Sequence, residues 1–176
     1  MRHFLLALFA GLTLAGCDAA DTPAPAGAQE TQAGAALALT GRVVDAAELL
    51  EPADELALTE RLAAIEERTE AQVVVVTTPS LGGADIADYA RDLGNAWGIG
   101  HAERDDGLLV VVAPAEKQVR IAVGLGLEDR VSDAEAQEII ETMMPYFRTG
   151  RFPEGLARGV DLLRGQLENA SLEQAA

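Results

Sequence analysis

The chain has 176 residues, 49% of them hydrophobic and 24% charged, which is typical of one globular domain with short appendages. Acidic residues outnumber basic residues 29 to 13, so the formal net charge is −16; this excludes a nucleic-acid binder, because phosphate contacts need clustered lysine and arginine. The single cysteine excludes an internal disulfide, and the two histidines exclude a histidine-rich metal site.

The first 16 residues have the pattern of a lipoprotein signal peptide. A short basic start precedes an apolar run over residues 4–16, which is shorter than the roughly 20 residues of a membrane-spanning helix. Residues 14–17 (Leu-Ala-Gly-Cys) resemble the bacterial lipobox, in which the cysteine is acylated and becomes the new N-terminus. We therefore predict lipidation at Cys17; a plain signal peptide with an incidental cysteine is the alternative.

The predicted location follows from this lipid. The protein is expected to be exported and lipid-anchored to the bacterial cell membrane, with its domain facing the periplasm. By resemblance to proteobacterial lipoproteins, Asp18 after the cysteine favours retention in the inner membrane. Residues 17–40, rich in Ala, Gly, Pro, Thr and Gln, predict a disordered linker that carries the lipid-anchored cysteine. The folded domain is expected over residues 41–168, followed by a polar tail over residues 169–176.

The first half of the folded part predicts two helices and a strand between them. Pro52, with acidic neighbours, marks a helix start, and an apolar stripe from Leu58 carries that helix to about Thr69. Residues 71–78 contain four consecutive valines, which are typical of a strand buried on both faces in a parallel sheet. Apolar residues at helical spacing then predict a helix over residues 86–97.

The second half predicts a hairpin followed by two helices. Residues 107–114 and 119–124 form two strands, and the four residues between them suit a hairpin turn. Ser132 and Glu135 make a capping-box pattern that opens a helix, which Pro145 ends or kinks, and the last helix begins near Pro153. The order of elements predicts an α/β sandwich with a mixed sheet.

Acidic residues flank both strands of the predicted hairpin. Asp105 and Asp106 precede its first strand, Glu128 and Asp129 follow its second strand, and Asp133 opens the next helix. In an antiparallel pair the start of one strand lies beside the end of the other, so these carboxylates are expected at one end of the sheet. A divalent cation with oxygen ligands, Ca²⁺ or Mg²⁺, would relieve their repulsion. Solvated loop acids and helix caps are the alternative interpretation.

Other groups near this end allow several roles. His101, Arg104 and Arg130 border the acids and could bind an anion, and His101 could move protons near neutral pH; ordinary surface residues are the alternative for each. The glycines at 124 and 126 could offer backbone N–H groups to a phosphate, but a tight turn explains them as well. Signatures of serine, thiol and zinc hydrolases are absent, so metal-activated water is the route available for any hydrolysis.

Six short motifs, in order and spacing, resemble the TPM domain family over residues 42–167. They comprise residues 43–45 with the valine-rich strand, residues 97–100 (Trp-Gly-Ile-Gly), 105–109 (Asp-Asp-Gly-Leu-Leu), 124–128 (Gly-Leu-Gly-Leu-Glu) and 145–150 (Pro-Tyr-Phe-Arg-Thr-Gly). The resemblance implies a three-layer α/β/α sandwich in an exported, membrane-associated protein. It also implies a divalent-metal site in acidic loops, often occupied by calcium, and an acid phosphatase activity that is attributed to a plant member.

Carried over by motif, the metal ligands would be Asp105, Asp106 and Glu128, with Asp133 next. Asp106 stands where the family often has Asn, so the local negative charge here is greater. Asp45 and Arg148 also match family positions, but each has an equally good structural role, at a helix start and a helix end.

Three hypotheses of function follow. In the first, the domain is a metal-dependent phosphomonoesterase. In the second, it is a non-catalytic, calcium-binding module that docks on other envelope proteins and serves membrane-protein maintenance. In the third, it is a tethered structural domain whose acids bind nothing. We expect a membrane-tethered TPM domain that binds a divalent cation in its acidic loops and acts as a metal-dependent phosphatase; the non-catalytic calcium-binding module is the alternative.

Overall fold

A computed structural model describes residues 37–174 of the chain. The predicted signal peptide, Cys17 and most of the predicted linker lie outside these residues. No helix in the described range is both long and apolar enough to cross a membrane.

A mixed sheet of four strands forms the centre of the fold, in the order β1-β2-β3-β4. The first three strands run parallel to one another, and β4 returns antiparallel to β3, which confirms the predicted hairpin. We call the end of the sheet at which β1, β2 and β3 begin the amino edge, and the end at which they finish the carboxyl edge. The long sides of the outer strands are called outer edges. The strands are β1 (Val43–Asp45), β2 (Gln72–Thr77), β3 (Gly107–Ala113) and β4 (Gln118–Val123).

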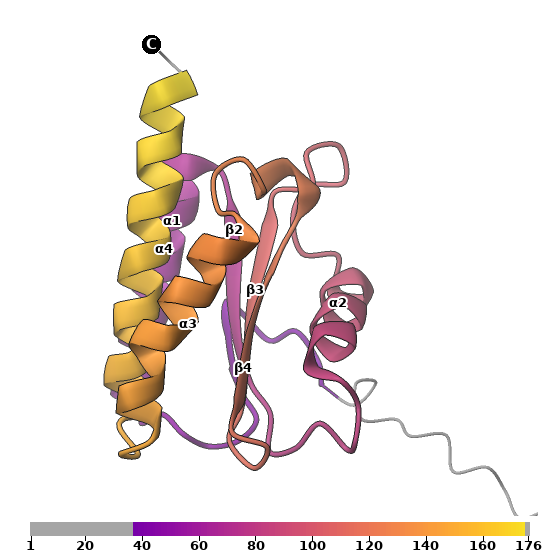
Figure 1. Cartoon of the computed structure of the whole chain (residues 1–176), viewed down its shortest axis with the longest axis vertical. Helices are drawn as coiled ribbons and strands as arrows, with labels where there is room; N and C mark the ends of the chain where they lie inside the picture. Colours follow the sequence, from indigo (N-terminus) through magenta and orange to yellow (C-terminus); the bar gives the residue numbers. More distant parts are fainter. Residues whose placement is uncertain (1–36, 175–176) are drawn as a thin grey trace, which may run out of the picture. The chain divides into compact units, whose positions relative to one another are not determined.

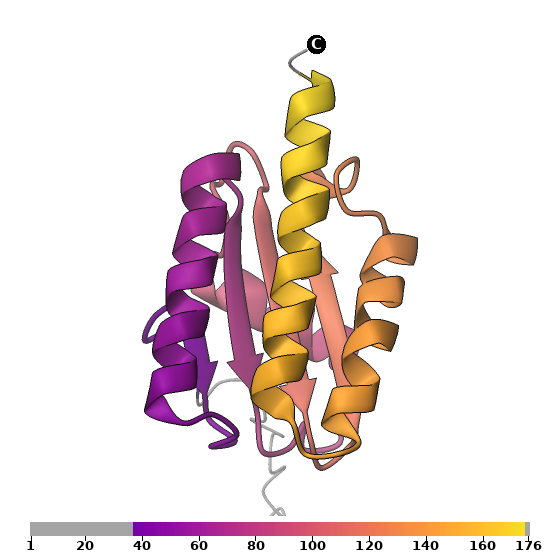
Figure 2. The same cartoon turned by 90° about the vertical axis from the view of Figure 1, so that its left-hand side faces the viewer.

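Helices cover both faces of this sheet. Three helices, α1, α3 and α4, lie on one face, and α2 lies on the other (Figures 1 and 2). This arrangement is the predicted three-layer α/β/α sandwich. The helices are α1 (Pro52–Thr69), α2 (Ile86–Trp97), α3 (Asp133–Phe147) and α4 (Phe152–Gln174), and a short 3₁₀ turn, η1 (Leu125–Leu127), follows β4.

The core is aliphatic and falls into two clusters, one on each face of the sheet. Alternate residues of β2 point to opposite faces, so Val73 and Val75 pack against α1 and α4, while Val74 and Val76 pack against α2. All four valines are buried, because helices cover both faces. The run of valines is therefore explained by burial on both faces of the sheet, as the sequence predicted.

Three features differ from the prediction or go beyond it. The strand β1 is only three residues long, too short to show a periodic pattern. The helix α3 runs two residues past Pro145, which stands in its last turn. The helix α4 continues to Gln174, well beyond the last apolar residue of its stripe, Leu167.

The two parallel crossovers of the sheet have opposite hands. Strands β1, β2 and β3 step across the sheet in one direction, yet α1 and α2 lie on opposite faces. In Figure 2 the helix α1 lies in front of the sheet, β1 lies to the left of β2, and both strands run downward. The connection β1–α1–β2 is therefore left-handed, which is rare among such units.

Candidate functional site

Two loops meet at the amino edge of the sheet, as the hairpin predicts. The N–H of Gly124 donates to the carbonyl of Gly107 at 2.8 Å, and the N–H of Gly126 donates to the carbonyl of Asp105 at 3.1 Å. A Cβ atom at Gly126 would collide with the carbonyl oxygen of Arg104, so only glycine allows this approach. The glycine N–H groups therefore join the two loops and are not directed at a phosphate.

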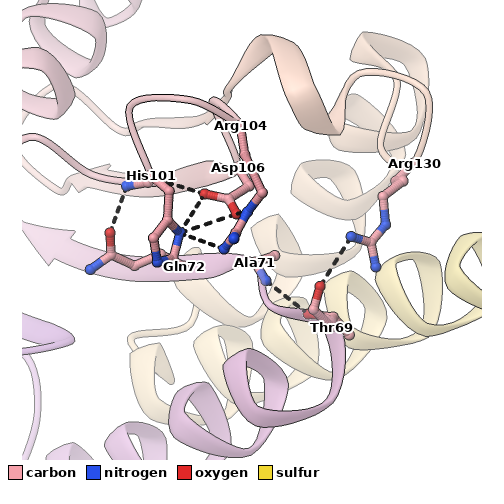
Figure 3. A network of polar contacts seen from close by, with 8 residues as sticks. Thr69, Ala71, Gln72, His101, Arg104, Asp106 and Arg130 are labelled. Atoms are coloured by element: carbon pink, nitrogen blue, oxygen red, sulfur yellow. Dashed lines mark hydrogen bonds and ion pairs between the residues drawn. The ribbon is translucent and has the colours of Figure 1, made fainter.

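Asp106 is the centre of a polar cluster in these loops (Figure 3). Its side chain is 8% exposed, and its Oδ1 accepts a hydrogen bond from the backbone N–H of His101 at 2.7 Å. Its Oδ2 accepts from Nε of Arg104 at 2.5 Å. The neighbouring N–H of Gly100 donates to Oε1 of Gln72, which ties this loop to β2. We call His101, Arg104 and Asp106 the Asp106 cluster.

The ring of His101 has two competing partners in this cluster. Its Nδ1 lies 2.9 Å from Oδ1 of Asp106 and 2.8 Å from Nη2 of Arg104. A guanidinium can only donate, so Nδ1 accepts from Arg104 when it carries no proton and donates to Asp106 when it carries one. The two contacts cannot both be hydrogen bonds at the same time.

The cluster keeps Asp106 ionised. Burial alone would raise the pKa of this carboxyl, but the hydrogen bonds from the His101 N–H, from Arg104 and from the His101 ring lower that pKa to about 2. In return, the hydrogen bond to Asp106 raises the pKa of Arg104. A cation supplied by the chain itself thus compensates the buried carboxylate.

Arg130 lies at the same amino edge of the sheet, but its hydrogen bonds give it a structural role. Its guanidinium donates to the carbonyl of Thr69 at 3.2 Å and to the carbonyl of Leu167 at 2.6 Å, so it joins the end of α1 to α4 (Figure 3). Burial lowers the pKa of Arg130, against the opposing charges of Asp106 and Glu70. Its hydrogen bonds to backbone carbonyls do not favour the predicted anion-binding role.

The other predicted metal ligands are exposed and do not converge on Asp106. Asp105 is exposed and has a left-handed backbone, with φ of 48°. Glu128 is exposed at the end of η1. Asp133 is the first residue of α3; its side chain is 91% exposed and lies 3.7 Å from Arg120. The two loops are neighbours, but exposure rather than a shared partner is what these three carboxylates have in common.

This arrangement can be compared with what a divalent ion requires. Calcium takes six to eight oxygen ligands, several of them from carboxylates on one centre. Between residues 37 and 174, no three His, Cys, Asp or Glu side chains are placed to share a metal ion. Both oxygens of Asp106 already hold donors from His101 and Arg104. In this conformation the residues do not fit a bound ion, and the metal site stays a prediction.

A second polar arrangement lies at the opposite, carboxyl edge. Oδ2 of Asp45 accepts from the N–H of Leu50 at 2.8 Å, and Oδ1 accepts from the hydroxyl of Thr77. The Thr77 hydroxyl oxygen accepts in turn from the N–H of Ala47 at 3.0 Å. Asp45 therefore holds the loop before α1, and the structure places it away from the Asp106 cluster.

The structure also shows a cavity that no motif predicted. It has a volume of about 480 Å³ and lies between the β3–β4 hairpin and the turn that joins α3 to α4. Lys117 and Arg148 are the only charged residues of its lining. No sequence pattern could have shown it, because its lining combines residues from β3, β4, α3 and α4. We call this space the hairpin cavity.

Comparisons with known proteins agree with this fold. The N-terminal domain of a protein from P. gingivalis is 36% identical, with a TM-score of 0.69 over 74% of this chain and 84% of that one. The N-terminal domain of the cg2496 protein from Corynebacterium glutamicum is 17% identical, with a TM-score of 0.59 over 72% of this chain and 79% of that one. The BA42 protein of Bizionia argentinensis is 24% identical, with a TM-score of 0.61 over 69% of this chain and 83% of that one. The last two likenesses show the fold alone.

A search of curated proteins found no match. The family model described as the TPM domain, whose name also mentions a phosphatase, matches residues 43–166. These residues span the whole sheet, the Asp106 cluster and most of α4. The chain belongs to the TPM domain family.

Proposed function

We propose that this TPM domain is a binding module without catalytic activity, the second of the three hypotheses. One observation carries the proposal: both oxygens of Asp106 hold hydrogen bonds from His101 and Arg104. A metal-dependent phosphatase needs carboxylates that are directed at an ion, which then polarises the phosphoryl group and activates water. Here the best-placed carboxylate is directed at a guanidinium of its own loop.

The test of this proposal is turnover of p-nitrophenyl phosphate by the full chain with Ca²⁺ or Mg²⁺ present. We expect no turnover above that of an Asp106→Asn variant. Turnover that is lost in Asp106→Asn, while its circular dichroism spectrum stays unchanged, would establish the phosphatase in place of the binding module.

A divalent cation as ligand of this module is the second proposal. It requires Arg104 to leave Asp106, because both oxygens of that carboxylate hold donors in the conformation described above. It is supported by the glycine contacts that hold the loop before Glu128 against Asp105, so that the two acidic loops stay adjacent. A cation at this edge would compete with Arg104 for Asp106, because both are positive and the carboxylate is nearly buried.

Calorimetric titration with Ca²⁺ and Mg²⁺ tests this competition. We expect saturable binding that Asp106→Asn abolishes and that Arg104→Gln strengthens, since the second variant removes the competitor. Asp133→Asn is a matched control for charge, because Asp133 is also acidic but is 91% exposed. Absence of binding in both the natural chain and Arg104→Gln would contradict a cation site.

We also propose that the module is exported and tethered by a lipid at Cys17. The lipobox-like residues 14–17 and the position of the only cysteine support this. Metabolic labelling with an alkyne fatty acid should mark the natural chain and not Cys17→Ser. A tethered domain of this kind would act on other envelope proteins at the membrane surface.

A further inference from the structure

The outer edge of β4 is the longest unpaired backbone edge of the sheet. β4 pairs only with β3, and the strand at the other edge, β1, has only three residues. The N–H of Gly124 donates to Gly107, so the alternation of an antiparallel ladder turns the N–H and C=O groups of Val119, Ile121 and Val123 away from β3.

No other segment between residues 37 and 174 pairs with these six backbone groups. Figure 1 shows the sheet edge-on, with β4 as the strand nearest the viewer, between α3 and α2. Proteins usually protect such an edge with a bulge, a proline, a short strand or a covering segment. β4 has six residues and no proline; its one charged residue, Arg120, forms an ion pair with Asp133 at the start of α3. The outward backbone groups of Val119, Ile121 and Val123 are the groups that an added strand would use.

The hairpin cavity lies beside the first residues of this edge. Its walls are mostly apolar and include Val119 of β4, Met144 and Phe147 of α3, and Phe152 of α4. The rings of Phe147 and Phe152 stack with centroids 5.3 Å apart, which gives the cavity a firm wall. A volume of about 480 Å³ is enough for a large apolar side chain from a strand added next to β4.

The charged groups of the cavity are both positive, in a chain whose net charge is −16. Neither Lys117 nor Arg148 forms an ion pair with any residue that the structure describes. The neighbouring acid, Glu116, has partners in another loop: its Oε1 accepts from the hydroxyl of Ser80 and from the N–H of Leu81.

Lys117 is held in place by the hairpin turn. Its φ is 56° and its N–H donates to the carbonyl of Pro114 at 3.2 Å, which is the geometry of a residue that closes a turn between two strands. The hairpin thus brings the only lysine of the chain into the lining of an apolar cavity.

We propose that the outer edge of β4 binds an extended acidic peptide segment of a partner protein. The segment adds a fifth strand to the sheet, hydrogen-bonds to the backbone of Val119, Ile121 and Val123, and places one apolar side chain in the hairpin cavity. Its carboxylates lie near Lys117 and Arg148. This inference rests on the proposed binding function and names the surface and the chemistry of the partner, but it uses no residue of the Asp106 cluster.

The alternative is that a second copy of this chain pairs with the outer edge of β4. In a symmetric β4–β4 pairing, both copies would bring the same two cations, Lys117 and Arg148, to the new strand pair. An acidic segment supplies the opposite local charge instead. The charge of the cavity therefore favours a partner strand over a dimer.

The probe is a synthetic peptide of alternating phenylalanine and glutamate, eight residues long and blocked at both ends. It is titrated into the full chain labelled with ¹⁵N. We expect saturable shifts at the amides of Val119, Ile121 and Val123 and slower hydrogen exchange at the same amides, since they gain acceptors. The charge reversals Lys117→Glu and Arg148→Glu should each weaken binding roughly threefold and should not weaken a peptide in which lysine replaces glutamate.

Two controls separate strand addition from binding of an apolar side chain alone. Val119→Pro removes one outward N–H, while Val119→Ala removes a similar part of the side chain and keeps that N–H. Binding should be lost in the first and reduced only slightly in the second. If Val119→Pro fails to fold, a peptide with alternate N-methyl groups makes the same test on the natural chain and should not bind.

Three results would overturn the proposal. One is absence of saturable binding, and the second is equal binding of the N-methylated peptide. The third is a dimer, detected by sedimentation velocity without peptide, that protects the amides of β4. Phosphatase turnover would contradict the proposed function without affecting these results, so the two failures are distinguishable.

Discussion

Asp106 shows how a single buried carboxylate can be compensated from within a loop. Arg104 is two residues away in sequence, and the backbone N–H of His101 completes the cluster. The carboxylate of Asp106 therefore stabilises the folded state only while it is ionised, and this makes the stability of the cluster sensitive to acid.

The pH dependence of stability follows from the lowered pKa. In the folded protein the pKa of Asp106 is about 2, below the value of 3.8 expected in the unfolded chain. The stabilisation is therefore present above about pH 4 and is lost as the pH falls toward 2; a shift of this size corresponds to about 2 kcal/mol. Urea unfolding at pH 7 should show Asp106→Asn less stable by about that amount.

The same measurement at lower pH is the control. The difference in unfolding free energy between the natural chain and Asp106→Asn should shrink toward zero near pH 2. A difference that stays constant from pH 7 to pH 2 would show that the charge of Asp106 contributes nothing.

At the scale of elements, α3 begins at two adjacent residues with different roles. The hydroxyl oxygen of Ser132 accepts from the N–H of Glu135, and the carboxylate of Glu135 accepts from the N–H of Ser132, which completes the predicted capping box. Asp133 follows directly but has only a distant ion pair with Arg120.

These roles predict unequal effects of two neighbouring substitutions. Ser132→Ala should destabilise the fold by about 1 kcal/mol, because it leaves a helix N–H without its acceptor. Asp133→Asn should cost roughly 0.5 kcal/mol or less, since the side chain is almost fully exposed. Thermal unfolding of both variants measures this; equal losses would mean that Asp133 has a structural role that its contacts do not show.

Elements with a strong local pattern were predictable, and those without one were not. The valine run of β2, the capping box of α3 and the hairpin all carry local patterns, and each is confirmed. The strand β1 has three residues and depends on β2 for its pairing, so the sequence alone could not define it.

The same distinction applies to the candidate site. The hairpin argument correctly brought the loops at 105 and 126 together, because strand direction decides which ends meet. The pairing of Asp106 with Arg104 depends on the path of an irregular loop, for which no periodicity exists. The hairpin cavity combines residues from β3, β4, α3 and α4, so only the tertiary structure could show it.

At the scale of the whole molecule, excess negative charge is the dominant electrostatic feature. The net charge of −16 disfavours the compact state through repulsion, while exposed ion pairs such as Arg61–Asp161 between α1 and α4 contribute little. Added salt screens both effects, and we expect the repulsion to be the larger, because acidic residues outnumber basic residues 29 to 13.

Thermal stability should therefore rise with monovalent salt. Between about 10 mM and 150 mM KCl the screening length falls from roughly 30 Å to 8 Å, and we expect the melting temperature to rise by a few degrees. Scanning calorimetry in KCl and in NaCl should give the same increase. A melting temperature that falls with salt would mean that the surface ion pairs outweigh the repulsion.

The opposite hands of the two crossovers have a consequence for where a ligand can bind. The chain leaves β1 toward one face and leaves β2 toward the other, so their outgoing connections diverge at the carboxyl edge. In open α/β sheets such a topological switch point is the usual crevice for a ligand. Here the two carboxylate oxygens of Asp45 accept from the N–H of Leu50 and from the hydroxyl of Thr77. The polar groups at this point are therefore paired within the chain, whereas the outward backbone groups of β4 are not paired with any described segment.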